Sequence, residues 1–201
     1  MSTPEPRPAP PAPWPVRAAL GVVRGLQRIN IAVALVCGLA LLATVILVLA
    51  EIILRQTAGR GLGGSDEIAG YVMAGVAAWG LAYALTERAH VRIDVATGRL
   101  PAPGRAVFDL LSLVSLTGVA GVVSWWGWRV LSRSLERNST ANTPLETPLW
   151  IPQSVWVSGW LWLTLVGALL TLCVVVLMAA RRWGQVQQVA GTMGEVKEVT
   201  R

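Results

Sequence analysis

The stretch from Ile29 to Leu54, INIAVALVCGLALLATVILVLAEIIL, decides the fold of this chain. Between Ile29 and Ala50 it contains no charged side chain. A helix rises 1.5 Å per residue, so this stretch is long enough to cross a hydrocarbon core of about 30 Å. Three further apolar stretches follow, at about 68–86, 106–130 and 150–180. The sequence therefore predicts an all-α integral membrane protein with four transmembrane helices.

The overall composition agrees with a lipid environment. Of the 201 residues, 54% are hydrophobic and only 14% are charged, whereas about a quarter of the residues in a typical soluble domain are charged. The charged residues gather between the apolar stretches. This length fits one membrane domain, over about 29–182, and no second globular domain.

The distribution of positive charge predicts the orientation. Twelve Lys and Arg residues fall before the first span, between the second and third, or after the fourth, and five fall on the other side, at or beyond the ends of the first and third spans. Lys and Arg accumulate on the cytoplasmic side of membrane proteins, so both ends of the chain are expected in the cytoplasm. The net charge of +6 then reflects topology, and no basic motif predicts nucleic-acid binding.

The ends of the chain differ from the spans. Residues 1–15 include seven prolines, which predicts a disordered cytoplasmic tail. Over 16–28, Arg17, Arg24 and Arg28 fall on one helical face, opposite Val16 and Val23. This pattern predicts an amphipathic interfacial helix on the membrane surface, and the alternative is a cytoplasmic extension of the first spanning helix. Residues 183–201 are expected to form a polar cytoplasmic tail.

Local signals mark the ends of the second and fourth spans. After a glycine-rich loop, Ser65 can cap the second span, with Asp66 and Glu67 in its first turn, where the helix dipole favours negative charge. Small residues along this span predict close packing against protein. Tryptophans end the third span and begin the fourth, and are expected to mark one membrane interface.

The spans lack the groups that chemistry or solute passage needs. Their centres contain no ionisable residue that would mark a solute pathway. The only histidine, His90, lies in a loop, and we find no set of metal ligands, no nucleophile with a base and no phosphate-binding loop. We therefore expect neither an enzyme nor a cofactor site. From the residues alone, the chain is a small helical membrane subunit that partners another membrane protein.

A set of sequence features, in a fixed order along the chain, indicates a particular family. It comprises Arg55, the acidic pair Asp66 and Glu67, a span with Trp79-Gly80, the segment Glu87-Arg-Ala-His-Val-Arg-Ile-Asp94, a Leu100-Pro101 turn, and Thr143–Pro152 before the last span. This set resembles the small permease (DctQ) subunit of tripartite ATP-independent periplasmic (TRAP) transporters. The resemblance covers roughly residues 30–175.

The resemblance implies a role without catalysis. The small subunit would pack on a large permease that holds the substrate and sodium sites, and a periplasmic binding protein would deliver an organic anion. It also implies a multi-pass protein of the bacterial inner membrane. The competing interpretation is an accessory or assembly subunit of another bacterial membrane complex, with no part in solute uptake.

Eight residues are candidates for partner contact or for a structural role. Arg55, Asp66 and Glu67 would face the periplasm and contact the large subunit or the binding protein, or serve only as a helix cap and a local ion pair. His90, Arg92 and Asp94 would form a cytoplasmic turn near the lipid headgroups. The remaining two are Trp79 and Pro152.

Overall fold

Four long helices dominate the computed structural model, which describes residues 13–61, 63–89 and 100–191. They are α1 (Trp14–Ala58), α2 (Ser65–Thr86), α4 (Ala102–Glu136) and α5 (Trp150–Ala179), and each is long and apolar enough to cross a membrane. A short helix, α6 (Trp183–Ala190), follows them. The predicted all-α class with four candidate spans is confirmed for the described residues, and the N-in/C-in orientation stays a prediction.

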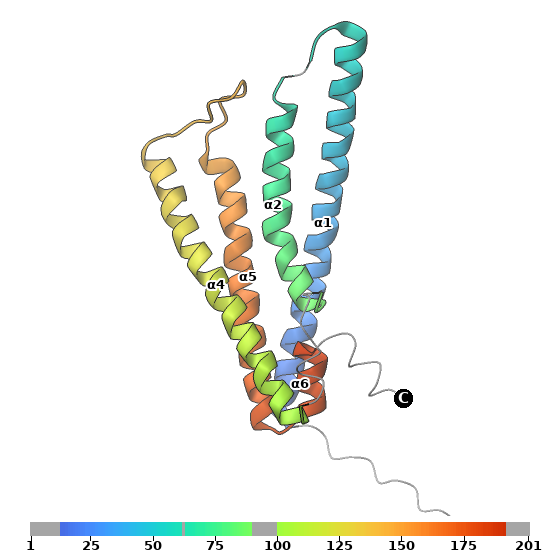
Figure 1. Cartoon of the computed structure of the whole chain (residues 1–201), viewed down its shortest axis with the longest axis vertical. Helices are drawn as coiled ribbons and strands as arrows, with labels where there is room; N and C mark the ends of the chain where they lie inside the picture. The colour runs from blue at the N-terminus through green and yellow to red at the C-terminus, as the bar shows by residue number, and fades with distance from the viewer. Residues whose placement is uncertain (1–12, 62, 90–99, 192–201) are drawn as a thin grey trace, which may run out of the picture.

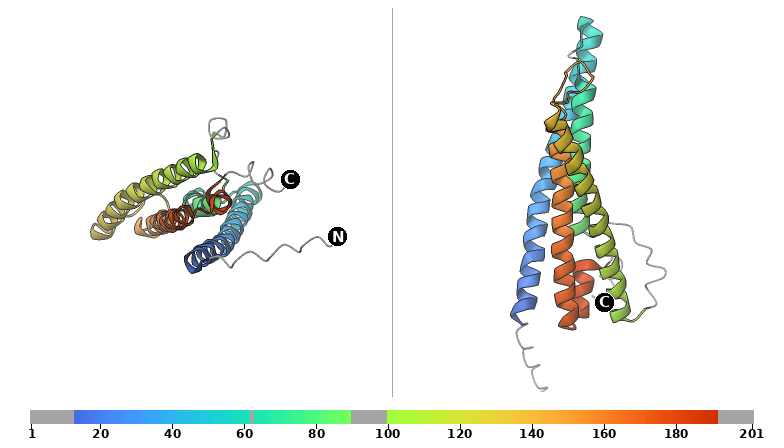
Figure 2. Two further views of the ribbon diagram at one scale, coloured as in Figure 1. Left: turned by 90° about the horizontal axis from the view of Figure 1, so that it is seen from below. Right: turned by 90° about the vertical axis from the view of Figure 1, so that its left-hand side faces the viewer.

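The long helices lie side by side in the order α4, α5, α2, α1 (Figure 1). Helix α5 contacts α4, α2 and α1, so it occupies the middle of this row. Seen from its edge, the row is narrow (Figure 2). The α4/α5 pair and the α1/α2 pair diverge toward the end that is away from α6 (Figure 1). The row leaves much of the apolar surface of its edge helices uncovered.

Helix α1 is one continuous helix of 45 residues, so the segment 16–28 joins the first spanning helix without a break. Such an extension of the first spanning helix was the alternative. The reason is packing: the predicted apolar face, including Val16 and Val23, is buried in one cluster with Cys173 and Leu177 of α5. The position of the segment relative to the membrane surface stays a prediction.

Both predicted tails are shorter in the described structure. At the start, Trp14 and Pro15 already belong to α1, where a proline in the first turn removes no hydrogen bond. At the end, residues 183–190 form α6 where a polar tail was expected. Val186, Val189 and Ala190 recur at helical spacing and are buried on this helix, which contacts α4 and α5. Residues 1–12 and 192–201 lie outside the described residues.

Two helix ends also differ from the expectation. Gly64, with φ of 82°, takes the N-cap position of α2, while Ser65 is the first helical residue and makes no capping hydrogen bond. A Cβ atom at Gly64 would overlap the side chain of Leu145 from the α4–α5 loop, so glycine satisfies both the backbone and the space there. Helix α4 continues to Glu136, beyond the span end expected near 130.

Helices α2 and α5 approach closely through small residues. A Cβ atom at Gly159 of α5 would lie 2.8 Å from the Cβ atom of Ala78 of α2, closer than such atoms pack. Ala78 is 1% exposed and Ala82, one turn further on, is fully buried. Small side chains allow helix backbones to approach in membranes. The packing of the second span against protein, expected from its small residues, is therefore confirmed.

Candidate functional site

A buried polar network joins three helices near the middle of the row. Asn30 of α1 is fully buried, and its Nδ2 atom donates to the carbonyl oxygen of Ala82 at 3.1 Å and to Oγ1 of Thr86 at 3.2 Å, both on α2. The Oδ1 atom of Asn30 accepts a hydrogen bond of 2.8 Å from Nε1 of Trp162 on α5. A buried amide is costly unless it is hydrogen-bonded, and here both ends of the amide are paired. The network fixes the register of α1, α2 and α5.

Trp79 continues this junction between α2 and α5. Its Nε1 atom donates to the carbonyl oxygen of Val155 at 3.0 Å. Its ring stacks on Trp162, with centroids 6.4 Å apart and an angle of 25° between the planes. Trp79 therefore ties two helices of the same chain together, which gives this candidate residue a structural role.

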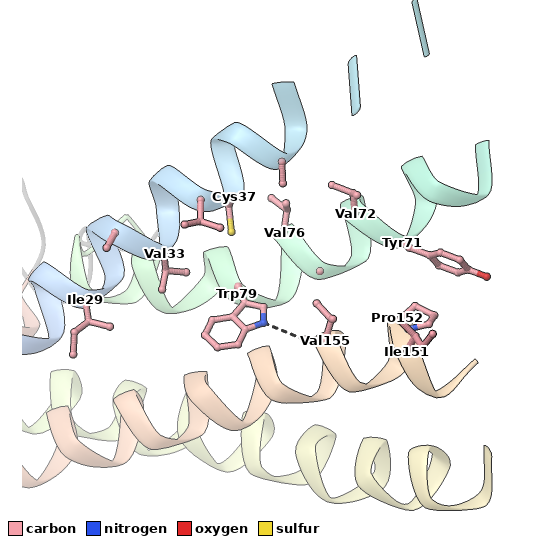
Figure 3. Close-up of a pocket in the computed structure, with 14 residues that line it drawn as sticks. Ile29, Val33, Cys37, Tyr71, Val72, Val76, Trp79, Ile151, Pro152 and Val155 are labelled. Atoms are coloured by element: carbon pink, nitrogen blue, oxygen red, sulfur yellow. Dashed lines mark hydrogen bonds between the residues drawn. The ribbon is translucent and has the colours of Figure 1, made fainter. Parts of the chain in front are cut away.

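An apolar groove lies between α1 and α5, with α2 between them (Figure 3). Its volume is about 610 Å³. Trp79 and Pro152, two of the sequence-predicted residues, both line it, as do Cys37 of α1 and Tyr71 of α2 (Figure 3). The lining is almost free of polar atoms, so the groove suits hydrocarbon or apolar side chains and not a polar solute.

The acidic and basic candidates at the other end of α1 and α2 do not form one cluster. The Nη2 atom of Arg55 lies 2.8 Å from Oε1 of Glu51 on its own helix, and Glu51 is only 3% exposed. This is the local ion pair that was the alternative to partner contact. The side chain of Arg55 is 66% exposed, so part of its guanidinium group remains accessible.

Glu67 and Asp66 differ although they are neighbours in the first turn of α2. The hydroxyl group of Tyr71 donates to Oε1 of Glu67 at 2.6 Å, while Oε2 is buried without a hydrogen bond of ordinary geometry. The carboxylate also faces Thr143 of the α4–α5 loop. Asp66 is exposed. Glu67 thus supports the contact between the first turn of α2 and the α4–α5 loop, and Asp66 is accessible from outside.

His90, Arg92 and Asp94 lie outside the described residues. Within the described ranges, no group of three or more His, Cys, Asp or Glu side chains could hold a metal ion.

Sequence reasoning missed Asn30 and Trp162, the centre of the polar network. Ionisable groups are the usual sign of a polar site within a span, and Asn30 is a neutral amide at the edge of the first apolar stretch. The available signal was a polar residue one position inside an apolar run, opposite arginines on the same helix. Such a residue in a spanning helix usually finds a partner on a neighbouring helix.

A comparison with known protein families identifies the family of this chain. A family model described as "Tripartite ATP-independent periplasmic transporters, DctQ component" matches residues 44–182, which is more than half of the chain. This chain belongs to the DctQ family. No curated protein and no solved structure matches it.

As a DctQ component, the chain is the small permease subunit of a TRAP transporter, and it is a multi-pass membrane protein. The matched part begins inside α1 and ends three residues after α5. It includes Trp79, Pro152 and Trp162, whereas Asn30 precedes it. One partner in the polar network of this DctQ subunit therefore comes from outside the part that defines the family match.

Proposed function

We propose that this subunit packs along the large permease of a sodium-driven TRAP transporter in the bacterial inner membrane. A periplasmic binding protein delivers an organic anion to the pair, and the large permease moves it. The observation that carries the proposal is the DctQ match over residues 44–182. The chain itself performs no catalysis in this scheme.

The side chains of the described helices favour a structural role for this chain and not a path for the solute. Two pairs of polar side chains between helices bond each other: Asn30 with Trp162, and Ser124 of α4 with Thr164 of α5 at 3.1 Å. The groove between α1 and α5 is apolar. An anion needs positive or polar groups along its path through a membrane, so the path belongs to another chain.

The exposed apolar surface favours a membrane partner. In the most apolar stretch of α1 no residue is buried, because α1 is at the edge of the row. We propose that α1 and its neighbours are covered partly by lipid and partly by the large permease. Among the charged candidates, Arg55 and Asp66 are exposed and remain proposed contacts for the permease or the binding protein. His90, Arg92 and Asp94 remain proposed members of a structural cytoplasmic turn.

The first experiment is affinity purification of the tagged full chain from its native membrane in mild detergent, with mass spectrometry of the bound proteins. We expect a large, many-helix permease in a fixed ratio. Uptake of candidate organic anions by liposomes that contain both chains should then require an inward sodium gradient.

Other outcomes point elsewhere. Recovery of a different membrane complex would favour the competing function, an accessory or assembly subunit without a role in uptake. Recovery of the chain alone would contradict a stable permease complex. Uptake that persists without sodium would contradict the proposed energy source while leaving the subunit assignment intact.

A further inference from the structure

Two contacts define how α1 and α5 are aligned. The Sγ atom of Cys173 lies 3.6 Å from the carbonyl oxygen of Ala19, and Nε1 of Trp162 lies 2.8 Å from Oδ1 of Asn30. The two contacts are about eleven residues apart in both helices, counted in opposite directions. The two helices therefore run antiparallel with the same rise per residue. Each residue of α1 can be paired with the residue of α5 that lies at the same height, which is the position along the common axis.

This alignment places the arginines of α1 beside apolar residues of α5. Arg28 precedes Asn30 by half a turn, so it lies at about the height of Thr164. From there α5 continues to Ala179 without a charged residue, over about 24 Å at 1.5 Å per residue. Leu172 within this part is 60% exposed. An uncharged, exposed part of one helix thus lies next to a basic part of another.

The position of α4 indicates that the helices do not stand perpendicular to the membrane plane. Ser124 of α4 bonds Thr164 of α5, so Ser124 is also at the height of Arg28. Arg129 is just over one turn further along α4, or about 8 Å. In a chain with four spans, the start of the first and the end of the third lie on opposite sides of the membrane. Arg28 and Arg129 nevertheless differ in height by only about 8 Å. Their helices, α1 and α4, lie at opposite edges of the row (Figure 1).

A membrane perpendicular to the helices would therefore place either arginines in hydrocarbon or exposed leucines in water. Both are unfavourable. An oblique row removes the conflict, because tilting lowers one edge relative to the other, and long apolar helices accommodate tilt. The first turns of α1 then run along the cytoplasmic headgroup layer while the neighbouring part of α5 remains in the hydrocarbon.

We propose that the face of α1 formed by Arg17, Arg24 and Arg28 binds the headgroups of anionic phospholipids. All three side chains are exposed, and they occur along one helical face over about 16 Å. The opposite face is buried against protein, which holds the arginines toward the membrane surface. Guanidinium groups bind phosphate oxygens well, and the exposed apolar part of α5 lies where acyl chains would run. This proposal does not depend on the transport function.

The binding test compares two triple variants of the full chain by native mass spectrometry in mild detergent. Arg17→Gln/Arg24→Gln/Arg28→Gln removes the proposed face. The matched control is Arg129→Gln/Arg133→Gln/Arg137→Gln, which removes three exposed arginines from the last turns and the C-cap of α4. With phosphatidylglycerol and phosphatidylcholine offered equally, the parent and the control should retain phosphatidylglycerol preferentially. The first variant should lose this preference by roughly fivefold or more.

Two results would overturn the lipid site. One is an unchanged preference in the first variant, or an equal loss in both variants. The other is release of the lipid by millimolar inorganic phosphate, which would indicate a site for free phosphate. All six substituted side chains are exposed, so both variants should fold, and equal melting temperatures check this.

A second measurement tests the orientation directly. Gly21 of α1 and Leu172 of α5 lie at about the same height, because Ala19 contacts Cys173. Single cysteines at these two positions, with Cys37 and Cys173 replaced by alanine, are treated in vesicles with a membrane-impermeant maleimide from the cytoplasmic side. We expect Gly21→Cys to react and Leu172→Cys to be protected. If both react or both are protected, the oblique arrangement is wrong.

Discussion

Helices α1 and α5 are both strongly apolar, but they differ in how much of their surface is buried. No residue in the most apolar stretch of α1 is buried, whereas 39% of the corresponding stretch of α5 is. Helix α5 contacts α1, α2 and α4, and its glycines allow the close approach of α2 at Gly159 and of α4 at Gly167. Apolar composition alone thus identifies a span but not its neighbours. The position of small and hydrogen-bonding residues distinguishes the central helix from the edge helix.

The strongest way to break this comparison is to enlarge a glycine in the central helix. Gly159→Leu should lower the free energy of unfolding by about 3 kcal/mol or prevent folding, because a side chain there meets Ala78 and Trp79. The matched control is Gly38→Leu in α1, where a Cβ atom has no neighbour within 4 Å. Thermal unfolding and yield in detergent measure both. Equal effects at the two sites would contradict the central position of α5.

The next test removes the polar link between the two helices. Asn30→Leu leaves the indole N–H of Trp162 without its partner and removes the hydrogen bonds from Asn30 to Ala82 and Thr86, so we expect a loss of about 2 kcal/mol in the free energy of unfolding. Thr44→Val is the control, because Thr44 bonds only the carbonyl oxygen of Ala40 on its own helix. A fluorescence change of the tryptophans on unfolding can follow both variants. If the control lost as much stability as Asn30→Leu, the polar network would not be what stabilises the contact between α1 and α5.

A weaker effect is expected on the other side of α5. Thr164→Val removes the hydrogen bond to Ser124 of α4, and bonds of this kind between membrane helices contribute about 0.6 kcal/mol. A double-mutant cycle with Ser124→Ala isolates the coupling from changes in each helix. A coupling energy near zero would show that α4 and α5 are held by apolar packing alone.

The smallest effect should come from the exposed side of α1. Leu39 is 67% exposed, and Leu39→Ala should change the free energy of unfolding of the isolated chain by less than about 0.5 kcal/mol. Its counterpart is Leu163→Ala in α5, which is 2% exposed and should cost about 2 to 5 kcal/mol. Chemical denaturation in one detergent compares them directly. Similar losses would mean that α1 is covered in the isolated chain.

The sequence predicted the spans because long uncharged runs have few other uses. It also predicted the small-residue packing of α2, since small residues such as Gly75 and Ala78 recur along this span. It did not predict α6 or the burial of the α1 extension. Both depend on distant residues, and the apolar face that includes Val16 has the same pattern whether it meets a lipid surface or a protein helix.

The candidate site was predicted in part. Trp79 and Pro152 do line a groove, but their neighbours on α1 and α5 could be known only from the three-dimensional arrangement. The ion pair of Arg55 with Glu51 follows from a spacing of four residues on one helix, and was accessible from the sequence. The hydrogen bond from Trp162 to Asn30 was not, because 132 positions separate the two residues.

That separation has a consequence for biosynthesis. The ribosome produces Asn30 early and Trp162 much later, so the first helix enters the membrane well before its amide can meet the indole. Until then the Oδ1 atom of Asn30 has no partner, and the apolar face opposite the arginines is uncovered. Long-range pairing of this kind forms late, and the last helices therefore complete the first one. A chain that terminates before α5 should be recognised as incomplete by membrane quality control.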